Sequence, residues 1–358
     1  MAVFLLGLIG AAGSRALSRQ VTATPTTVIL TTMKLLIVVH HRFDLWQVPA
    51  WFGTKLGKDF PQLQIVQRDS YEGIEEHLRD AEIIFTISLR PEQFAAARKL
   101  RWVHAPTAAV HQLLFAELVN SEVVITNSTE VHGPVVAEHV MALIFALAKK
   151  IPQAAVLQQK RVWGQEQIWA MRPREIAGAT LGLIGLGSIG RRVAQMASSL
   201  GMRVIGVREH VEKGSPEGVE TVFPPSKLDE VLKQSDYVVV AAPLVEATRG
   251  LINAARLAVM KPEAFLINVG RGPQVDEVAL VEALRARQIA GAALDVFEKE
   301  PLPADSPLWG EENLLITPHT AGLTDKLWHR HYGLFSENLR RYLTRQPLLD
   351  VVDKQKGY

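Results

Sequence analysis

The sequence of 358 residues contains no cysteine. This absence excludes disulfide bonds, a catalytic thiolate and any metal site with cysteine ligands, and it is compatible with a reducing compartment. The chain also has little net charge, because 39 Lys and Arg against 37 Asp and Glu give a formal charge of +2. So small a charge favours neither nucleic acid nor an anionic membrane as a partner. We predict no metal site.

The N-terminal segment, residues 1–32, lacks the features of a membrane span. Its apolar run is about ten residues long, whereas a span needs about 20, and it has no basic region typical of a secretory signal. No acidic residue precedes Asp44, and Arg15 and Arg19 lie one helical turn apart, as in mitochondrial presequences. Two interpretations stay open: an extension of a cytoplasmic enzyme whose fold begins near Met33, or a mitochondrial targeting segment.

Hydrophobic residues make up 48% of the chain and charged residues 21%, as is typical of a soluble α/β protein. From Met33 onward, strand-like apolar runs alternate with helical patterns, which predicts parallel sheets covered by helices. The predicted strands are 35–39, 82–87, 102–105, 123–127, 181–187, 203–207, 237–242, 264–270, 291–297 and 314–319. Long helices are predicted at 135–158 and 326–345.

These elements predict two α/β domains. The first comprises residues 33–134 together with 322–358, because the C-terminal helix is expected to return to it. The second comprises residues 135–321 and contains the glycine-rich turn described next. The first domain is therefore predicted to be discontinuous in sequence.

The segment TLGLIGLGSIGRR predicts a dinucleotide-binding turn between a strand and a helix. Gly185 permits the tight turn, Gly187 lets a pyrophosphate approach the backbone, and Gly190 allows close packing of helix on sheet. Ser188 and Ile189 begin the helix, whose N-terminal amides and partial positive charge attract phosphate. A plain strand–turn–helix unit without a ligand is the alternative.

Arg208 stands where such domains usually carry an acidic residue that binds the adenosine ribose. A guanidinium binds a 2′-phosphate instead, and His210 and Lys213 add positive charge nearby. We therefore expect NADP(H) to be preferred, with NAD(H) possible. Glu209 is the counter-argument, since it could take the role of the carboxylate while Arg208 faces solvent.

Three side chains with catalytic chemistry follow later predicted strands. Arg271, Glu300 and His319 suit reduction of a 2-oxo acid at the carboxyl ends of the strands, where ligands bind in such sheets. The arginine binds the substrate, the imidazole donates a proton to the carbonyl oxygen, and the glutamate holds the other ring nitrogen and fixes the tautomer.

The ordered motifs GLGSIG, AAPLVEATRGLIN, NVGRG, GAALDVFEKEPLP and ITPHTAG resemble those of the D-isomer-specific 2-hydroxyacid dehydrogenases. The resemblance implies a flavodoxin-like substrate domain and a dinucleotide-binding domain, both Rossmann-like with parallel sheets, and an active-site cleft between them. It also implies that Arg271, Glu300 and His319 form the catalytic set. Beside the cofactor it places Pro243, Thr248, Val269 and Asp295.

The same resemblance assigns the loop 107–110 to the substrate carboxylate. Its backbone amides belong to Thr107, Ala108, Ala109 and Val110. The sequence departs from the family pattern at Ala109, where glycine is usual, and has histidine at 111, where aspartate is frequent. Because alanine tolerates positive φ less readily than glycine, the geometry of this grip is in question. Packing between a strand and a helix is the alternative role of the loop.

Family members are commonly homodimers joined through the cofactor domain, which implies that the helix at 135–158 belongs to the interface. Trp163 and Trp169 precede the cofactor strand. In some glyoxylate and hydroxypyruvate reductases a tryptophan near this position reaches the active site of the partner. Core or interface packing without substrate contact is the other interpretation.

Together these features predict an NAD(P)H-dependent reductase that converts a small 2-oxo acid, glyoxylate or hydroxypyruvate above all, to the D-2-hydroxy acid. Phosphoglycerate dehydrogenases of the same family carry an acidic residue at the position of Arg208. Three alternatives stay open: another 2-hydroxyacid dehydrogenase, a formate or phosphonate oxidoreductase, and an NAD(H)-sensing corepressor built on the same fold.

Overall fold

The computed structural model of the protein describes residues 33–41 and 43–357, so the interpretations of residues 1–32 lie outside it. The described chain contains two parallel sheets, which confirms the predicted α/β class. The strand order is β2-β1-β3-β4-β5 in the first sheet and β12-β11-β10-β9-β6-β7-β8 in the second. Buried apolar strands such as β1 and β9 are typical of parallel sheets covered by helices on both faces.

The strands of the first sheet are β1 (Met33–Val38), β2 (Leu63–Arg68), β3 (Ile83–Thr86), β4 (Trp102–His104) and β5 (Val124–Thr126). Those of the second are β6 (Thr180–Ile184), β7 (Arg203–Val207), β8 (Thr221–Phe223), β9 (Tyr237–Val240), β10 (Phe265–Asn268), β11 (Gly291–Leu294) and β12 (Leu314–Ile316). Sequence analysis missed β2 and β8. Each lies at an outer edge of its sheet and is only partly buried, so neither forms a continuous apolar run.

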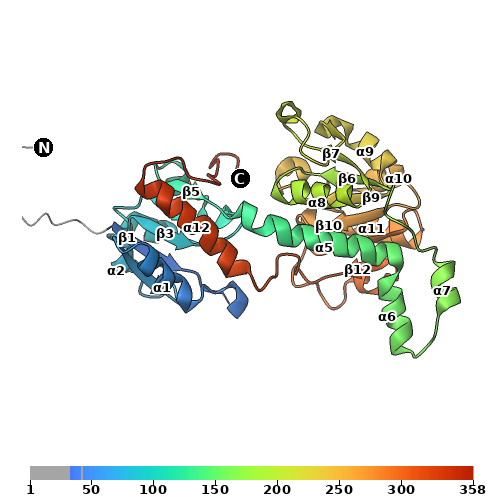
Figure 1. Ribbon diagram of the computed structural model, residues 1–358, viewed down its shortest axis with the longest axis horizontal. Helices are drawn as coiled ribbons and strands as arrows, with labels where there is room; N and C mark the ends of the chain where they lie inside the picture. The colour runs from blue at the N-terminus through green and yellow to red at the C-terminus, as the bar shows by residue number, and fades with distance from the viewer. Residues whose placement is uncertain (1–32, 42, 358) are drawn as a thin grey trace, which may run out of the picture. The chain divides into compact units, whose positions relative to one another are not determined.

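The helices cover these sheets and connect their strands (Figure 1). They are α1 (Ala50–Asp59), α2 (Glu75–Leu78), α3 (Pro91–Ala96), α4 (Ala116–Val119), α5 (Thr129–Lys149), α6 (Ile151–Gln159), α7 (Gln165–Ala170), α8 (Ser188–Ser199), α9 (Leu228–Gln234), α10 (Ala254–Val259), α11 (Glu277–Arg285) and α12 (Leu327–Leu343).

The single helix predicted at 135–158 was wrong, because the chain forms two helices there. Lys150 separates α5 from α6 and has a left-handed backbone with a φ of 59°. Pro152 follows in the first turn of α6, where its missing N–H costs nothing, but it cannot donate to a continuing α5. At its other end α5 begins at Thr129, six residues before the predicted start at 135, and so contains Pro134.

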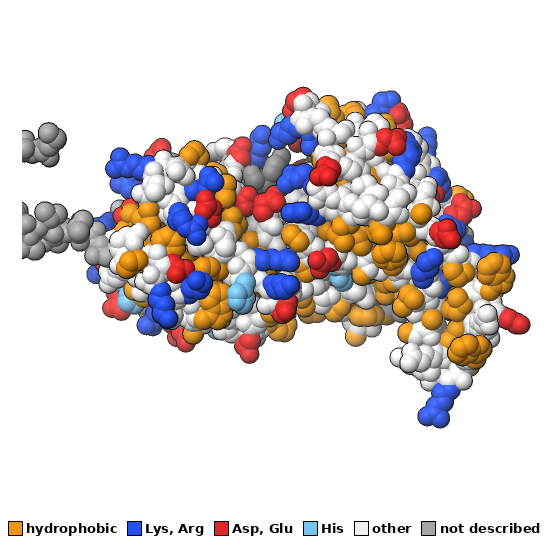
Figure 2. Space-filling model, viewed as in Figure 1, with side chains coloured by type: hydrophobic (Ala, Val, Ile, Leu, Met, Phe, Trp, Pro, Cys, Tyr) orange, Lys and Arg blue, Asp and Glu red, His pale blue; other side chains and the backbone are white. Residues whose placement is uncertain are grey.

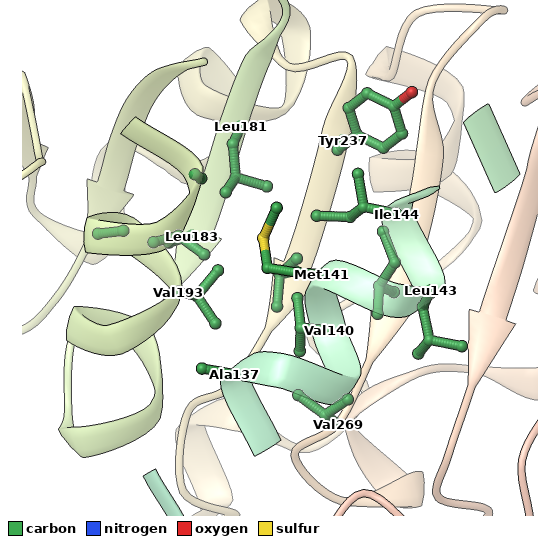
Figure 3. Close-up of a cluster of buried hydrophobic side chains, with 14 of the residues drawn as sticks. Ala137, Val140, Met141, Leu143, Ile144, Leu181, Leu183, Val193, Tyr237 and Val269 are labelled. Carbon is green, nitrogen blue, oxygen red and sulfur yellow. The ribbon is translucent and has the colours of Figure 1, made fainter. Parts of the chain in front are cut away.

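Helix α5 is the core helix of the second sheet. Ala137, Val140 and Ile144 on α5 pack against Leu183 of β6 and Val193 of α8 in one buried cluster (Figure 3). Among the described residues α5 alone is long and apolar enough to cross a membrane by length and composition, but most of its apolar surface is buried in this cluster. Its hydrophobicity therefore has a packing explanation.

Helix α12 covers the first sheet. Its residues Phe335 and Leu339 are fully buried in the cluster that contains Phe52 of α1, Phe85 of β3 and Trp102 of β4. The C-terminal helix thus packs beside elements that lie more than 200 residues earlier in the chain. The residue limits proposed for the two domains stay predictions.

Candidate active site

The glycine-rich turn joins the end of β6 to the start of α8. Gly185 has a φ of +100°, and a Cβ there would lie 2.7 Å from the backbone nitrogen of Ala242. At Gly190 a Cβ would lie 2.1 Å from the carbonyl oxygen of Gly185, so the helix approaches the turn as closely as glycine permits. Both glycines are therefore required by the fold of the turn itself.

Gly187 differs from its two neighbours. A Cβ at this position would meet no atom of the described protein within 4 Å, and the backbone does not have a positive φ. The protein's own packing therefore gives no reason for glycine here. Open space at the N-terminus of a 12-residue helix fits the approach of a phosphate group to the backbone.

The first turn of α8 is fixed to α5. The buried Ser188 hydroxyl donates to Glu130 Oε2 at 3.0 Å, and Glu130 Oε1 pairs with the Arg191 guanidinium at 2.8 Å. Gly133 of α5 gives the space for this contact, since a Cβ there would lie 2.3 Å from Ser188 Oγ. Ile189 is half-buried against the core cluster of α5. The Ser188 side chain is thus engaged in packing, which leaves its backbone amide as the group for a ligand.

Arg208 follows β7 directly and is half-buried. Its guanidinium donates to the carbonyl oxygens of His210 at 2.7 Å and Gly214 at 2.9 Å, and so holds the loop 208–214. Glu209 is exposed, and among the described residues it makes no hydrogen bond or ion pair. The cation therefore lies at the strand end, where an acidic residue is usual in dinucleotide-binding domains.

His319 and Glu300 form the tightest pair of the site. His319 Nδ1 lies 2.6 Å from Glu300 Oε2, and the Phe297 amide donates to Glu300 Oε1 at 3.0 Å. The carboxylate is thereby oriented by the backbone, and it orients the imidazole in turn. Both side chains are partly exposed, so the remaining ring nitrogen, Nε2, is the one that a ligand can reach.

The turn that presents His319 is held by Asp295, which is buried. Its carboxylate accepts hydrogen bonds from the Thr317 hydroxyl at 2.6 Å and from the amides of Thr320 at 2.8 Å and Ala321 at 3.0 Å. These bonds bracket His319, whose backbone has the left-handed φ of +54°. Its contacts within the protein make Asp295 a positioning residue for His319. Its predicted place beside a cofactor stays a prediction.

Arg271 follows β10 and is half-buried. Its amide donates to Gln274 Oε1 at 2.7 Å, and its guanidinium donates to the Gly270 carbonyl at 2.7 Å. Burial lowers the pKa of the guanidinium, while the nearby charge of Glu300 opposes this effect. The structure therefore brings Arg271 into the electrostatic neighbourhood of the Glu300–His319 pair.

The loop after β9 lies between the glycine turn and Arg271. Thr248 Oγ1 accepts from the Val245 amide at 2.9 Å and donates to the Pro243 carbonyl at 2.8 Å, which closes the loop on itself. The buried Gln274 also donates to Pro243 at 3.3 Å. Val269 is buried at the end of β10 and faces the core rather than open space.

The loop 107–110 follows β4 in the first sheet. The Thr107 hydroxyl donates to the Ala109 carbonyl at 2.7 Å, and the Asn127 amide group donates to the Ala108 carbonyl at 3.1 Å. Ala109 does not have a positive φ, so alanine fits this conformation, and Val110 is buried. Within the described residues no hydrogen bond or ion pair joins this loop to Arg271, Glu300 or His319.

Sequence reasoning missed two residues of this region. Gln274 fixes both the Arg271 amide and the loop after β9, and only its place two residues beyond the NVGRG motif marked it. His132 lies near Arg271, and burial together with this positive charge lowers its pKa to about 4. No sequence pattern pointed to His132, because it lies in the first turn of α5 and outside every motif that follows β6 to β12.

A cavity of about 620 Å³ adjoins the Glu300–His319 pair. It is lined by His41, Phe43, Trp46, Phe297, Glu300, Pro301, Leu302, Trp309, Ile316, Pro318 and His319. The carboxyl ends of β6, β9, β10, β11 and β12 share one edge of the parallel sheet, so the glycine turn, Arg271, Glu300 and His319 all lie along it. Such an edge can hold a dinucleotide and a small anion side by side.

Comparison with known proteins agrees with this geometry. The family profile described as D-isomer specific 2-hydroxyacid dehydrogenase, NAD binding domain, matches residues 141–321. The chain is 34% identical to the glyoxylate reductase of Korarchaeum cryptofilum over 310 residues, which covers 84% of this chain and 86% of that protein.

Two further proteins resemble this chain over different shares of their own length. The chain is 30% identical to the D-3-phosphoglycerate dehydrogenase of Methanocaldococcus jannaschii over 304 residues, 84% of this chain, and spans 57% of that protein's length. The crystal structure of the NADPH-dependent glyoxylate/hydroxypyruvate reductase of Sinorhizobium meliloti, in complex with NADP and sulfate, has a TM-score of 0.75 at 26% identity. It covers 91% of this chain and 100% of its own.

Proposed function

The chain belongs to the D-isomer specific 2-hydroxyacid dehydrogenase family, and we propose that it reduces small 2-oxo acids to D-2-hydroxy acids with a nicotinamide cofactor. The observation that carries the proposal is the 2.6 Å contact between His319 Nδ1 and Glu300 Oε2, with the charge of Arg271 nearby. A cation, an oriented imidazole and a carboxylate beside a dinucleotide-binding turn form the apparatus that carbonyl reduction needs.

The three side chains divide the work as follows. A nicotinamide cofactor held at the glycine turn would supply the hydride for the carbonyl carbon. Arg271 binds the negative charge of the 2-oxo acid through its guanidinium. His319 donates the proton from Nε2 to the carbonyl oxygen, while Glu300 holds Nδ1 and keeps the ring in that orientation. In the reverse reaction the same nitrogen takes the proton back.

For the substrate we favour glyoxylate or hydroxypyruvate, on the strength of the similarity to glyoxylate reductases. The backbone amides of the loop 107–110 are proposed to hold the substrate carboxylate. The hydrogen bonds from Thr107 to Ala109 and from Asn127 to Ala108 support this role, because they fix the loop without using its amides. A preformed set of amides binds a carboxylate at little cost in conformational entropy.

For the cofactor we favour NADP(H) over NAD(H), because Arg208 lies at the end of β7. Its hydrogen bonds to two loop carbonyls hold the guanidinium in place. Because these carbonyls are neutral, the guanidinium keeps its net positive charge and can still donate a charge-assisted hydrogen bond to phosphate. The open space at Gly187 supports the binding of the pyrophosphate.

The replacement Arg208→Asp is expected to reverse the cofactor preference. We expect kcat/KM with NADPH to fall by about 10- to 100-fold, because each charge-assisted hydrogen bond contributes about 1.5–3 kcal/mol. The value with NADH should hold or rise, since a carboxylate accepts bonds from the ribose hydroxyls. The measurement is initial-rate kinetics of both proteins with glyoxylate and hydroxypyruvate.

Arg192→Asp is the matched control, because it makes the same charge change on the exposed side of α8. If the wild type uses both cofactors equally and Arg208→Asp does the same, Arg208 does not select NADP(H). A lack of turnover with every 2-oxo acid and either cofactor would sink the proposed function. An NAD(H)-sensing corepressor on the same fold would give that second result.

We also propose that the protein is a homodimer joined through α5, α6 and α7. Hydrophobic side chains are exposed on this part of the surface (Figure 2). Trp163, between α6 and α7, is 91% accessible, and Trp169 of α7 is 66% accessible. An exposed apolar surface of this kind is typical of a protein interface. Sedimentation equilibrium should give twice the chain mass, and Trp163→Ser should lower it toward that of the monomer. A monomeric wild type contradicts the proposal.

A further inference from the structure

A second cavity lies at the opposite edge of the seven-stranded sheet from Arg271 and His319. Its volume is about 360 Å³, and it is formed where β10 and β12 begin, between the end of α5, α6 and the segment before β6. The residues that line it are Leu147, Lys150, Pro152, Gln153, Met171, Arg174, Pro262, Phe265, Arg287, Ile289, Ala290, Glu312, Asn313, Leu314 and Leu315. The glycine turn contributes none of them.

Three cations from separate parts of the chain meet in this cavity. Lys150 comes from the junction of α5 and α6, Arg174 from the segment before β6, and Arg287 from the turn that follows α11. In the part of the chain that the structure describes, none of the three forms an ion pair. Glu312 also lines the cavity, but it lies outside salt-bridge distance of all three. Within a single chain most of the positive charge is therefore uncompensated, and α6 places the cavity beside the dimer interface proposed above.

Local contacts hold two of these cations over one aromatic ring. Lys150 Nζ lies 4.9 Å and Arg174 Cζ 5.9 Å from the centroid of the Phe265 ring. Arg174 also donates to the Glu263 carbonyl at 2.8 Å. Burial and then the charges of Arg174 and Arg287 lower the pKa of the half-buried Lys150 ammonium. The charged form of this side chain is therefore destabilised by its surroundings.

The backbone supports the same arrangement. Lys150 and Arg287 both have left-handed conformations, with φ values of 59° and 54°. Such conformations are strained for residues other than glycine, and they persist only where the surrounding structure fixes them. The fold thus brings three like charges together in a concave, partly apolar site, an arrangement that is unfavourable until an anion compensates it.

We propose that this cavity binds a small multivalent anion of the phosphate class. Two guanidinium groups and an ammonium provide donors for several phosphate oxygens. Phe265, Leu147 and Met171 give an apolar wall for the rest of a phosphate-bearing molecule. The site is separate from the dinucleotide edge, and the proposal does not depend on the proposed reaction.

The test is calorimetric titration with inorganic pyrophosphate in metal-free buffer of low ionic strength. The full-length protein is first saturated with NADPH, so that the glycine turn is not open to the probe. Wild type, Lys150→Met and Arg287→Met are compared, with Lys233→Met as the control. Lys233 is exposed on α9 and lies outside the cavity, so its replacement makes the same change in net charge. We expect each cavity variant to bind at least about tenfold more weakly, and the control to bind as the wild type does.

Thermal unfolding without pyrophosphate shows whether the variants are folded. Because removing one of three crowded cations relieves repulsion, Lys150→Met should unfold at or above the temperature of the wild type. Equal affinity in all four proteins, or no binding by the wild type, overturns the proposal. A third outcome also overturns the proposal. If the wild type binds no pyrophosphate and the cavity variants lose the oligomer, the cations contact a second copy of the chain and do not bind an anion.

Discussion

The variant His319→Asn is expected to lose about 10²–10⁴-fold in kcat for reduction of a 2-oxo acid, because a positioned proton donor contributes a factor of this size. Asparagine suits the test better than alanine. It accepts the left-handed φ of +54° at this position with little strain, so the turn from Thr317 to Ala321 keeps its bonds to Asp295. The unfolding midpoint should therefore change little.

Glu300→Gln separates orientation of the ring from proton transfer. Its amide oxygen can still accept from the His319 ring or from the Phe297 amide, but the negative charge is lost. We expect kcat to fall less than in His319→Asn, with little change in KM. The pH profile of kcat should shift, which a purely structural role of the carboxylate would not produce. Stopped-flow absorbance of the reduced nicotinamide measures both effects.

The matched control is His329→Asn, which changes the same residue type at an exposed position on α12. It should keep the kcat of the wild type. If His319→Asn also keeps more than a tenth of that kcat, His319 is not the proton donor and the role assigned to it fails. Binding of the cofactor, followed by fluorescence, should be unchanged in all three variants.

The second large effect is expected in the glycine turn. There Gly190→Ala should lower the stability of the fold, whereas Gly187→Ala should lower the affinity for the cofactor. At Gly190 the new Cβ would lie 2.1 Å from a backbone oxygen, which cannot move aside as a flexible side chain could. We expect the free energy of unfolding to fall by about 1–3 kcal/mol or more, as for other overpacked sites. Urea denaturation followed by circular dichroism measures this change.

Gly187→Ala should leave the free energy of unfolding close to that of the wild type, because its Cβ meets no protein atom within 4 Å. Cofactor affinity should nonetheless fall by at least about tenfold, since the methyl group takes the space of the pyrophosphate. Fluorescence titration with NADPH measures the affinity. A stable Gly190→Ala, or a Gly187→Ala that binds NADPH normally, would contradict this account of the turn.

The pair of variants also separates two meanings of one motif. The spacing of glycines in GLGSIG indicates that other atoms approach the backbone closely. It does not show whether those atoms belong to the protein or to a ligand. The structure shows that the protein itself crowds Gly185 and Gly190 and leaves Gly187 open. Only Gly187 therefore needs a ligand to explain why glycine is present.

By itself the sequence determined the features that depend on local spacing. Apolar runs bounded by turns predicted ten of the strands, because a strand buried on both faces must be apolar along its length. The turn after β6, and the placement of Arg271, Glu300 and His319 after successive strands, were also predictable, since parallel strands end at one edge of a sheet. The edge strands β2 and β8 were not predicted, because polar residues interrupt β2 and β8 is the three-residue segment TVF.

Only the tertiary structure decided what these groups contact. Asp295 turned out to hold the turn around His319, and Arg208 to hold the carbonyls of its own loop. The three cations of the second cavity come from segments that lie up to 137 residues apart, between Lys150 and Arg287. The physical reason is common to all three cases. Spacing along the chain determines which backbone conformations are favourable, whereas hydrogen bonds and charge contacts depend on which distant segments the buried core brings together.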